Sequence, residues 1–375
     1  MAGELLKKGN DKYQVRVYLG KDESGKRKFH IKTIKGKKKA EKHLREILHQ
    51  KDKGTLVESG KTTVEEHFDL WLDSTVKDRV SDRTLLDYKE KVKLHINPAI
   101  GNIRLDKLNS DHLDKMFIGL KEKNLSPRSI RYIYTVLNSG LKHAVKRNKI
   151  YRNPAEFIGE DLPKHKREEM KVLTKEQATT FLDKAIASSM GTLFNLLITS
   201  GMRPSEALGL KWSDVDYDNF RVMINRKLTR TNNSWKLEEP KTSKSRRTIP
   251  LPKKVIEDLK GHQKEQAGYI LSCKPGKYNN QDFIFTANNG EPLSTRNVLM
   301  RHFKPLLKEA GLPDIRLYDL RHTCATLLLQ AGINPKVVSE RLGHSSIVLT
   351  LDTYSHVLPD MQEEASNKLE NILFN

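Results

Sequence analysis

The nine residues Thr199-Ser200-Gly201-Met202-Arg203-Pro204-Ser205-Glu206-Ala207 lie between two stretches with helical patterns. We expect an apolar helix to stop at Gly201 and the next helix to begin at Pro204, because proline suits the first turn of a helix. Arg203 then lies at a helix N-terminus, where unpaired N–H groups and the helix dipole favour an anion. Arginine can bind a phosphate through two parallel hydrogen bonds, and Glu206 could orient it. The stretch is equally compatible with an Arg–Glu pair that only stabilises the start of a helix.

Three further stretches of the C-terminal half carry residue types that phosphate chemistry uses. They are residues 240–247, residues 317–323, and residues 341–346 with the following 352–356. In the second, Arg321 opens an apolar helix, so that another arginine lies at a helix N-terminus. A lysine of the basic first stretch can donate a proton if an anionic site holds it. Each stretch alone is also typical of a solvated surface or of helix packing.

Residues 334–351 have the outline of a helix-turn-helix motif. The second helix of such a motif lies in the major groove of DNA and presents side chains to the base edges. Here that helix would carry four large apolar side chains, Ile347, Val348, Leu349 and Leu351. This helix is too apolar to face DNA, so a packed helical pair is the better interpretation.

Together the stretches give the ordered pattern Arg…Lys…Tyr-x-x-Arg…Gly-His…Tyr. With the phrases TSGMRPSEALGLKWSDVD, DLRHTCATLLLQAG and LGHSSIVLTLDTYSHV, residues 172–358 resemble the tyrosine recombinase (phage integrase) family. The likeness is to integrases of Gram-positive temperate phages and conjugative transposons. It implies a site-specific DNA recombinase that cuts and rejoins DNA through a 3′-phosphotyrosyl intermediate, and so integrates and excises a mobile element. The implied chemistry needs no cofactor, neither a metal ion nor ATP.

The resemblance assigns a role to each residue of the pattern. Arg203 and Arg321 would clamp the non-bridging oxygens of the scissile phosphate, and Tyr354 would be the nucleophile. Lys241 would protonate the leaving 5′ oxygen, and His344 would help to hold the phosphate or the nucleophile. The set is chemically sufficient, because phosphoryl transfer depends on charge neutralisation and an in-line nucleophile. A tyrosine with an ordinary pKa near 10 must be activated by the cations around it.

Two supporting assignments follow from the same resemblance. Glu206 matches the family's acidic position that supports the first arginine. Lys244 competes with Lys241 for the role of proton donor. We favour Lys241, because a threonine follows it, as in the family's Lys-Thr pair.

One position departs from the family's pattern. The family commonly has histidine three residues before the second arginine, whereas this chain has Tyr318. A phenol can donate a hydrogen bond to a phosphate but is a poor base near neutrality. We therefore expect Tyr318 to be a site residue whose acid–base role is open. The adjacent His322 is expected to point elsewhere on its helix and to be structural.

The composition supports a nucleic-acid partner. The chain has 375 residues, and its 68 Lys and Arg against 47 Asp and Glu give a formal net charge of +21. An excess of this size and sign indicates a polyanion, with nucleic acid the first candidate. The two cysteines are far apart, which excludes a disulfide scaffold and a cysteine-rich zinc site. No apolar run has the length of a membrane span and no signal peptide is evident, so we expect a cytoplasmic protein. The resemblance implies that it is bacterial and located on DNA.

Composition, periodicity and the resemblance predict a multidomain fold. Residues 1–58 carry 17 Lys and Arg against 8 Asp and Glu. They predict a small α+β module, two strands and a helix, which would bind arm-type DNA sites. Residues 62–160 predict an all-α, SAM-like helical bundle that would bind the core site. Residues 172–375 predict a mostly helical catalytic domain with a small antiparallel sheet, the DNA breaking-rejoining enzyme fold, ending in a tail helix.

The last helix of the predicted bundle carries basic side chains that could lie against phosphates. They are Arg128, Arg131, Lys142 and Lys146. The implied partner is double-stranded DNA with core and arm sites, held by a homo-tetramer on two duplexes. A host DNA-bending protein and an excisionase are possible additional partners, and no membrane is implied.

The C-terminal segment predicts a helix with one apolar stripe that includes Met361, Leu369 and Ile372. The helix either packs on its own catalytic domain or, as the resemblance favours, docks on a neighbouring protomer.

Two other functions are compatible with part of the sequence pattern. A type IB topoisomerase-like enzyme would share the Arg/Lys/Arg/Tyr chemistry, but the compact three-module layout and the basic N-terminal module argue against it. A non-catalytic DNA-binding regulator on a recombinase scaffold is disfavoured because the catalytic set is intact.

Overall fold

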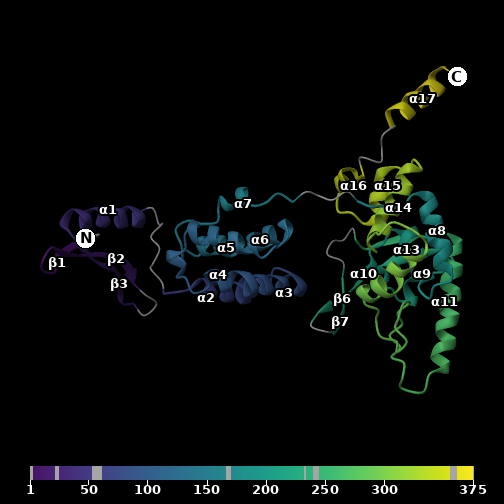
Figure 1. Cartoon of the computed structure of the whole chain (residues 1–375), viewed down its shortest axis with the longest axis horizontal. Helices are drawn as coiled ribbons and strands as arrows, with labels where there is room; N and C mark the ends of the chain where they lie inside the picture. The colour runs from purple at the N-terminus through teal and green to yellow at the C-terminus, as the bar shows by residue number, and fades with distance from the viewer. Residues whose placement is uncertain are drawn as a thin grey trace. The chain divides into compact units, whose positions relative to one another are not determined.

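The computed structural model describes residues 3–21, 25–52, 61–165, 170–231, 234–239, 245–354 and 361–374 (Figure 1). The chain divides into two compact units, residues 1–167 and residues 168–375. The predicted proton donor Lys241, and Lys244, which competes for that role, lie outside the described residues. In the part of the chain that is described, no helix is long and apolar enough to cross a membrane.

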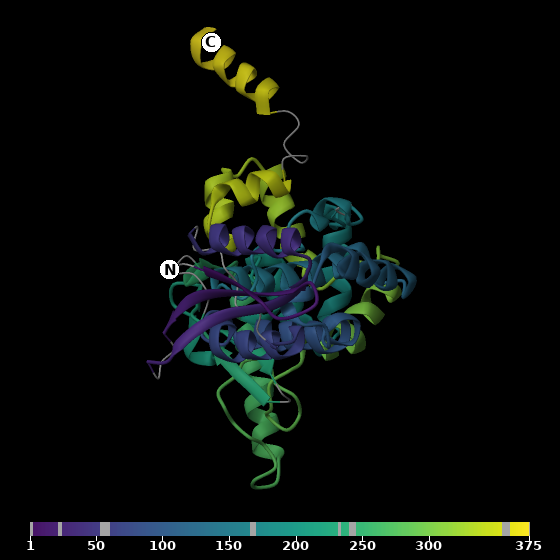
Figure 2. The same cartoon turned by 90° about the vertical axis from the view of Figure 1, so that its left-hand side faces the viewer.

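A three-stranded antiparallel sheet and one helix form the N-terminal module, which confirms the predicted α+β fold. The strands run in the order β1 (Gly3–Lys7), β2 (Lys12–Lys21) and β3 (Arg27–Lys35). Helix α1 (Lys37–Asp52) lies along one face of the sheet (Figure 2). Val15 and Val17, alternate residues of β2, are fully buried in the small core beneath α1. Strand β1 was not predicted, because its five residues are too few to show an alternating pattern.

The second part of the chain is a helical bundle, as predicted. Its helices are α2 (Val64–Trp71), α3 (Asp82–Lys91), α4 (Asn97–Ile100), α5 (Ser110–Glu122), α6 (Pro127–Lys146) and α7 (Ile158–Asp161). Helices α2 and α6 approach closely at Gly140, where a Cβ atom would lie only 2.5 Å from the ring of Phe68. The small residue therefore allows the aromatic ring to fill the centre of the bundle core.

Side-chain caps fix where these helices begin. Thr63 and Ser81 cap α2 and α3, and Ser126 caps α6 directly before its first-turn proline. Helix α5 has two residues of a type that favours caps at its start, Asn109 and Ser110. Asn109 is the cap, because its side-chain oxygen accepts the backbone N–H three residues further on.

The C-terminal region is mostly helical. Its helices are α8 (Lys175–Ile186), α9 (Gly191–Ser200), α10 (Pro204–Ala207), α11 (Lys253–Ser272), α12 (Thr295–Val298), α13 (Lys304–Glu309), α14 (Asp319–Gln330), α15 (Pro335–Leu342), α16 (Ile347–Tyr354) and α17 (Met361–Phe374). Its core is centred on three aromatic rings, with each pair of centroids 5.6 Å apart: Phe181, Phe194 and Phe303.

Two small antiparallel sheets complete this region and confirm the predicted β section. One has the order β4 (Val215–Asp216), β5 (Arg221–Ile224) and β8 (Arg247–Pro250), and the other is the hairpin of β6 (Lys227–Thr231) and β7 (Ser234–Glu238). Strand β8 follows the basic stretch that contains Lys241, so the sheet fixes the far end of that stretch.

Two helix ends bring the candidate site together. Helix α9 ends at Gly201, whose backbone is left-handed with φ +67°. A Cβ atom there would lie 2.7 Å from Leu342, so only glycine allows α15 to approach this turn. Helix α14 starts beside it, and the buried Asp319 carboxylate accepts the Arg316 backbone N–H at 2.8 Å, which fixes the turn before α14.

Candidate active site

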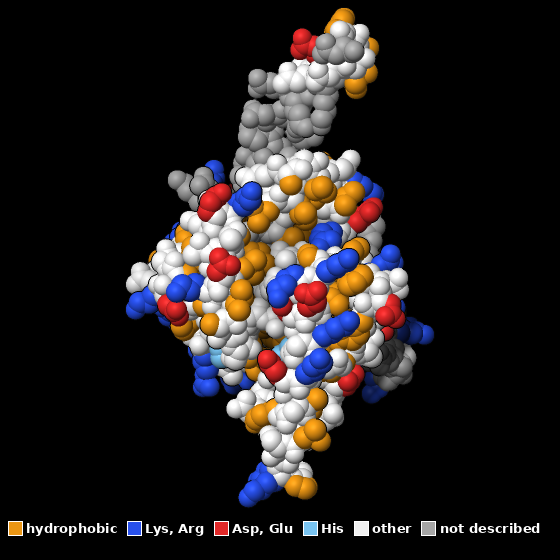
Figure 3. Space-filling view, turned by 90° about the vertical axis from the view of Figure 1, so that its right-hand side faces the viewer, with side chains coloured by type: hydrophobic (Ala, Val, Ile, Leu, Met, Phe, Trp, Pro, Cys, Tyr) orange, Lys and Arg blue, Asp and Glu red, His pale blue; other side chains and the backbone are white. Residues whose placement is uncertain are grey.

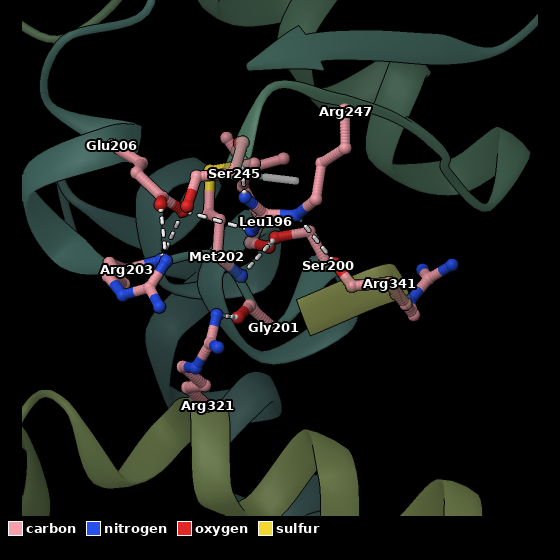
Figure 4. A network of polar contacts seen from close by, with 10 residues as sticks. All are labelled: Leu196, Ser200, Gly201, Met202, Arg203, Glu206, Ser245, Arg247, Arg321 and Arg341. Carbon is pink, nitrogen blue, oxygen red and sulfur yellow. Dashed lines mark hydrogen bonds and ion pairs between the residues drawn. The ribbon is translucent and has the colours of Figure 1, made fainter. Parts of the chain in front are cut away.

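Arg203 and Glu206 form the pair that their spacing predicts. The Arg203 backbone N–H and Nη1 donate to the two oxygens of Glu206 at 2.9 and 2.7 Å (Figure 4). Glu206 is buried, whereas about a third of the Arg203 side chain is exposed. The carboxylate therefore holds the guanidinium from within the protein and leaves part of it open to a ligand.

Arg247 completes this pair and was given no role by the sequence. Its Nη2 donates to Glu206 at 2.9 Å, and its Nε donates to the backbone carbonyl of Arg341 at 2.7 Å. Gly343 leaves room for this side chain, because a Cβ atom there would lie 2.9 Å from Arg247 Nη1. One carboxylate thus holds two arginines from different segments, the N-cap of α10 and the start of β8 (Figure 4).

The charge of Glu206 depends on these partners. Burial alone would raise the pKa of the carboxyl, but the guanidinium groups of Arg247 and Arg203 outweigh burial and lower it below its ordinary 4.5. A carboxyl whose pKa is lowered by folding stabilises the folded protein when it is ionised. This stabilisation is fully present above the ordinary pKa of the carboxyl, and it is lost as the pH falls through the lower pKa of the folded state.

Glu206→Ala should therefore destabilise the protein strongly. Removing one partner of a buried ion pair leaves uncompensated charge and typically costs about 3–5 kcal/mol. Urea unfolding at pH 7 measures this loss, and the difference between variant and wild type should shrink at pH below the ordinary carboxyl pKa. Glu309→Ala, which breaks an exposed pair with Lys184, is the matched control and should cost less than about 1 kcal/mol. Equal losses in the two variants would contradict a structural role for Glu206.

Arg321 is the most deeply buried guanidinium of the cluster, with 1% of its surface exposed. Its Nη1 donates to the Gly201 carbonyl at 2.8 Å (Figure 4). Its Nε and Nη2 are buried and have no hydrogen-bond partner among the described residues. Burial, with repulsion from Arg203, lowers its pKa to about 10, so it stays positive at neutral pH. Unpaired donors on a buried cation are costly unless an anion binds them.

Tyr354 ends α16 and is fully buried among the apolar side chains of α14 and α15. Burial raises the pKa of its hydroxyl, and the positive charge of Arg321 opposes that rise. His344 directs its Nδ1 to the Thr350 hydroxyl at 2.7 Å. Burial and the charges of Arg321 and Arg203 lower the pKa of His344 to about 4, so this imidazole is neutral at pH 7.

The side chain of His322 does not point elsewhere on its helix, as was predicted. Its Nδ1 lies 2.7 Å from the Tyr354 hydroxyl, so the predicted orientation is wrong, while the predicted structural role stays untested. Tyr318, which is 38% exposed, packs edge-on against the His322 ring and supports the charge of Arg203. The position of His322 on α14 could not predict this contact. The contact depends on how α16, which carries Tyr354, packs against α14.

The basic side chains of α6 lie in two settings. Arg128, Lys142 and Lys146 are exposed. Arg131 instead donates from Nη2 and Nε to the backbone carbonyls of residues 162 and 163, at 2.9 and 2.8 Å. Its guanidinium is engaged within the chain, while contact of the other three with DNA stays a prediction. Among the described residues, no group of three His, Cys, Asp or Glu side chains is placed to hold a metal ion.

The sequence profile of the Phage integrase family matches residues 171–361, half of the chain. The chain belongs to the phage integrase family. A second profile, for the N-terminal SAM-like domain of phage integrases, matches residues 63–120 within the helical bundle. The resemblance predicted from the sequence is confirmed, and this phage integrase family member is a tyrosine recombinase, a DNA breaking-rejoining enzyme.

Individual relatives of this phage integrase family member align with more of the chain than the family profile does. A tyrosine recombinase XerC-like protein of Caldanaerobacter subterraneus subsp. tengcongensis is 28% identical over 386 residues, which cover 98% of each chain. A variant of the Tn1549 transposon integrase, solved in complex with transposon right end DNA, is 25% identical with a TM-score of 0.69, over 84% of this chain and 100% of that one. The lambda integrase tetramer bound to a Holliday junction shares the fold, with 19% identity and a TM-score of 0.57, over 91% of this chain and 95% of that one.

Proposed function

We propose that this protein is a site-specific recombinase that integrates and excises a mobile element, with Tyr354 as the nucleophile of a 3′-phosphotyrosyl intermediate. The observation that carries the proposal is Arg321, a buried guanidinium with two unpaired donors. It acts electrostatically on the Tyr354 hydroxyl and on Arg203. A phosphodiester supplies the negative charge and the acceptor oxygens that such a cluster requires.

In the proposed cleavage step, Tyr354 Oη bonds to phosphorus and the bond from phosphorus to the 5′ oxygen breaks. Arg203 and Arg321 neutralise the non-bridging oxygens, and this effect is worth most in the transition state. Lys241 protonates the leaving 5′ oxygen, and neutral His344 donates a hydrogen bond to the phosphate. The phosphotyrosyl bond conserves the energy of the broken ester, so that rejoining needs no ATP.

A nicked substrate tests the proposed function, because the short 5′ fragment diffuses away and traps the covalent intermediate. The DNA should carry the attachment sequence found beside the gene. We expect a covalent protein–DNA adduct, mapped to Tyr354 by peptide sequencing, and strand exchange between two such duplexes. Relaxation of supercoils without exchange would favour a topoisomerase-like enzyme, and binding without an adduct would favour a regulator.

The N-terminal module is proposed to bind arm-type sites separate from the crossover site. Strand β2 carries Arg16 above the Phe29 ring, 3.9 Å from its centroid, and the charge of residues 1–58 is +9. A basic sheet of this kind gives binding that weakens as salt rises, because each neutralised phosphate releases counterions.

A chain truncated to begin at residue 60 should keep its footprint on the core site and lose the footprint on arm sites. Its binding should also depend less steeply on salt than binding by the full chain, since fewer phosphates are neutralised. Footprinting and binding titrations at several salt concentrations measure both. An unchanged arm footprint would assign this module another purpose.

Assembly is proposed to involve the tail helix α17 and a second protomer. Helix α17 exposes Leu369, Ile372 and Leu373, whereas the Met361 side chain lies outside what the structure describes. Apolar side chains also gather at the end of the C-terminal region that carries α15 (Figure 3). The exposed ones on α15, α16 and the loop before α15 are Ile333, Val337, Ile347, Val348, Leu349 and Leu351. We propose that this surface receives α17 of a neighbouring protomer, because burial of the two apolar faces would stabilise the contact.

Deleting residues 360–375 should then spare the binding of one protomer to a half-site and abolish cooperative loading. Native gel shifts on half-sites and on full sites distinguish the two. Leu369→Ser with Ile372→Ser should reproduce the deletion, while a Glu370→Ser control should not, because it leaves the apolar stripe intact. If the truncated protein still forms a full complex with four protomers, α17 packs within its own chain.

A further inference from the structure

His322 contacts the atom that would attack DNA. Its Nδ1 lies 2.7 Å from the Tyr354 hydroxyl oxygen, and the centroids of the two rings are 5.7 Å apart. The Tyr318 ring packs edge-on against the same imidazole, with centroids 5.2 Å apart, and restricts its rotation. The residue directly after Arg321 therefore reaches from α14 to the nucleophile on α16.

Two other described side chains near Tyr354 are less suited to taking its proton. Tyr318 is itself a phenol and a poor base near neutrality. His344 directs its Nδ1 to Thr350 instead of Tyr354. Imidazole is the side chain whose ordinary pKa lets it accept a proton at neutral pH. His322 combines that chemistry with direct contact.

The environment of Tyr354 makes a nearby acceptor necessary. Burial raises the pKa of its hydroxyl, and the nearby Arg321 charge does not cancel that rise. Loss of the proton to bulk water before attack is therefore unfavourable. Transfer to a hydrogen-bonded imidazole can instead accompany attack on the phosphate, while Arg321 stabilises the negative charge that develops.

We infer that His322 is the general base of the cleavage step and accepts the Tyr354 proton as the hydroxyl attacks the phosphate. The inference rests on the proposed function, since it assigns a residue to that same reaction. The proton passes from Tyr354 Oη to His322 Nδ1, Oη bonds to phosphorus, and the 5′ oxygen leaves with a proton from Lys241. In the rejoining step neutral Lys241 takes back the proton of the 5′ hydroxyl as its oxygen bonds to phosphorus. The bond from phosphorus to Tyr354 Oη breaks, and the imidazolium returns its proton to Oη.

Two substitutions of His322 separate proton transfer from positioning. His322→Ala should slow single-turnover formation of the covalent adduct by about 100- to 1,000-fold, as is typical when a general base is lost. His322→Asn places an amide near the position of Nδ1, which can keep the hydrogen bond but cannot take the proton, so it should be nearly as slow. Both variants should bind DNA like the wild type. His302→Asn, a partly buried histidine of the same region, is the control and should cleave normally.

A substrate with sulfur in place of the bridging 5′ oxygen separates the base from the acid, because a thiolate leaves without a proton. This substrate should restore cleavage by Lys241→Ala but not by His322→Ala. With it, the wild-type rate should also fall as the pH is lowered from about 8 to 5, where imidazole becomes protonated. That fall should be absent in His322→Ala.

Three described groups near His322, those of Tyr354, Arg321 and His344, do not change charge in this pH range. Burial raises the pKa of the Tyr354 hydroxyl, so this phenol keeps its proton throughout the range. Arg321 has a pKa of about 10, and His344, whose pKa is lowered to about 4, remains neutral. A fall in rate between pH 8 and 5 that disappears with His322 is therefore assigned to this imidazole.

Failure of the inference and failure of the proposed function give different results. If the wild-type protein forms no adduct at Tyr354, the proposed function fails. If that adduct forms and either His322 variant cleaves at the wild-type rate, only the general-base role is overturned. Restoration of His322→Ala by the sulfur substrate would also overturn it, because His322 would then act on the leaving group.

Discussion

Tyr354→Phe should bind DNA like the wild type and form no covalent adduct on a nicked substrate. The substitution removes only the hydroxyl, so the reaction has no nucleophile while the ring still fills its place. Because Tyr354 is fully buried and packs against Ala325, Leu329, Val338 and Leu342, phenylalanine should keep the fold. The lost hydrogen bond to His322 should change the free energy of unfolding by only about 1 kcal/mol.

Denaturing gels and a binding titration on the same DNA measure the two properties separately. Tyr278→Phe is the matched control, since that tyrosine also donates or accepts one side-chain hydrogen bond, to Thr286, and lies elsewhere in the region. It should form adduct at the wild-type rate. An adduct that persists in Tyr354→Phe would remove Tyr354 from the reaction.

Arg321→Met should lower the rate of cleavage by about 10³- to 10⁵-fold, the range known for an arginine that neutralises a transferring phosphoryl group. Arg321→Lys should also be strongly impaired, because lysine keeps the charge but loses the planar fork. Arg301→Met, an exposed arginine of the same region, is the control and should have little effect. Cleavage by the wild type should persist in EDTA, and a strict requirement for Mg²⁺ would contradict the arginine clamp.

The Arg321→Met variant should lose cleavage activity without losing thermal stability. The free chain buries a cation with two unpaired donors, and replacing a buried charge by an apolar side chain of similar volume is often neutral or stabilising. We therefore expect an unchanged or higher Tm together with the loss of cleavage. A large fall in Tm would show that Arg321 holds the fold together and would leave its catalytic role without separate support.

Local sequence signals predicted the parts of the site that depend on neighbouring residues. Arg203 and Glu206 are three residues apart at a helix start, so helical geometry alone brings them together. The fold classes of the sheet-and-helix module, the helical bundle and the mostly helical C-terminal region were also predicted, because helical and alternating apolar patterns mark helices and strands directly. The tyrosine, the second arginine and the Gly-His pair were identified by their order along the chain.

Contacts between distant segments were not predictable in the same way. Arg247 reaches Glu206 from 41 residues away, and His322 reaches Tyr354 from 32 residues away. Neither separation along the sequence corresponds to the repeat of a helix or a strand, so no local pattern indicates these contacts. The two hydrogen bonds of Arg131 to backbone carbonyls more than 30 residues away were likewise not predictable, and its predicted contact with DNA stays a prediction.

The shared carboxylate of Glu206 restricts how this protein can be combined with its relatives. Arg203 donates to both of its oxygens and Arg247 donates to one of them, and Arg247 also donates to the backbone carbonyl of Arg341. A chimera that takes one of these segments from a relative with different residues would inherit an unmatched charge in its interior. Exchanges between integrases should therefore transfer residues 199–207, 245–250 and 339–344 as one unit, and crossover points inside that set should yield mostly unfolded chains.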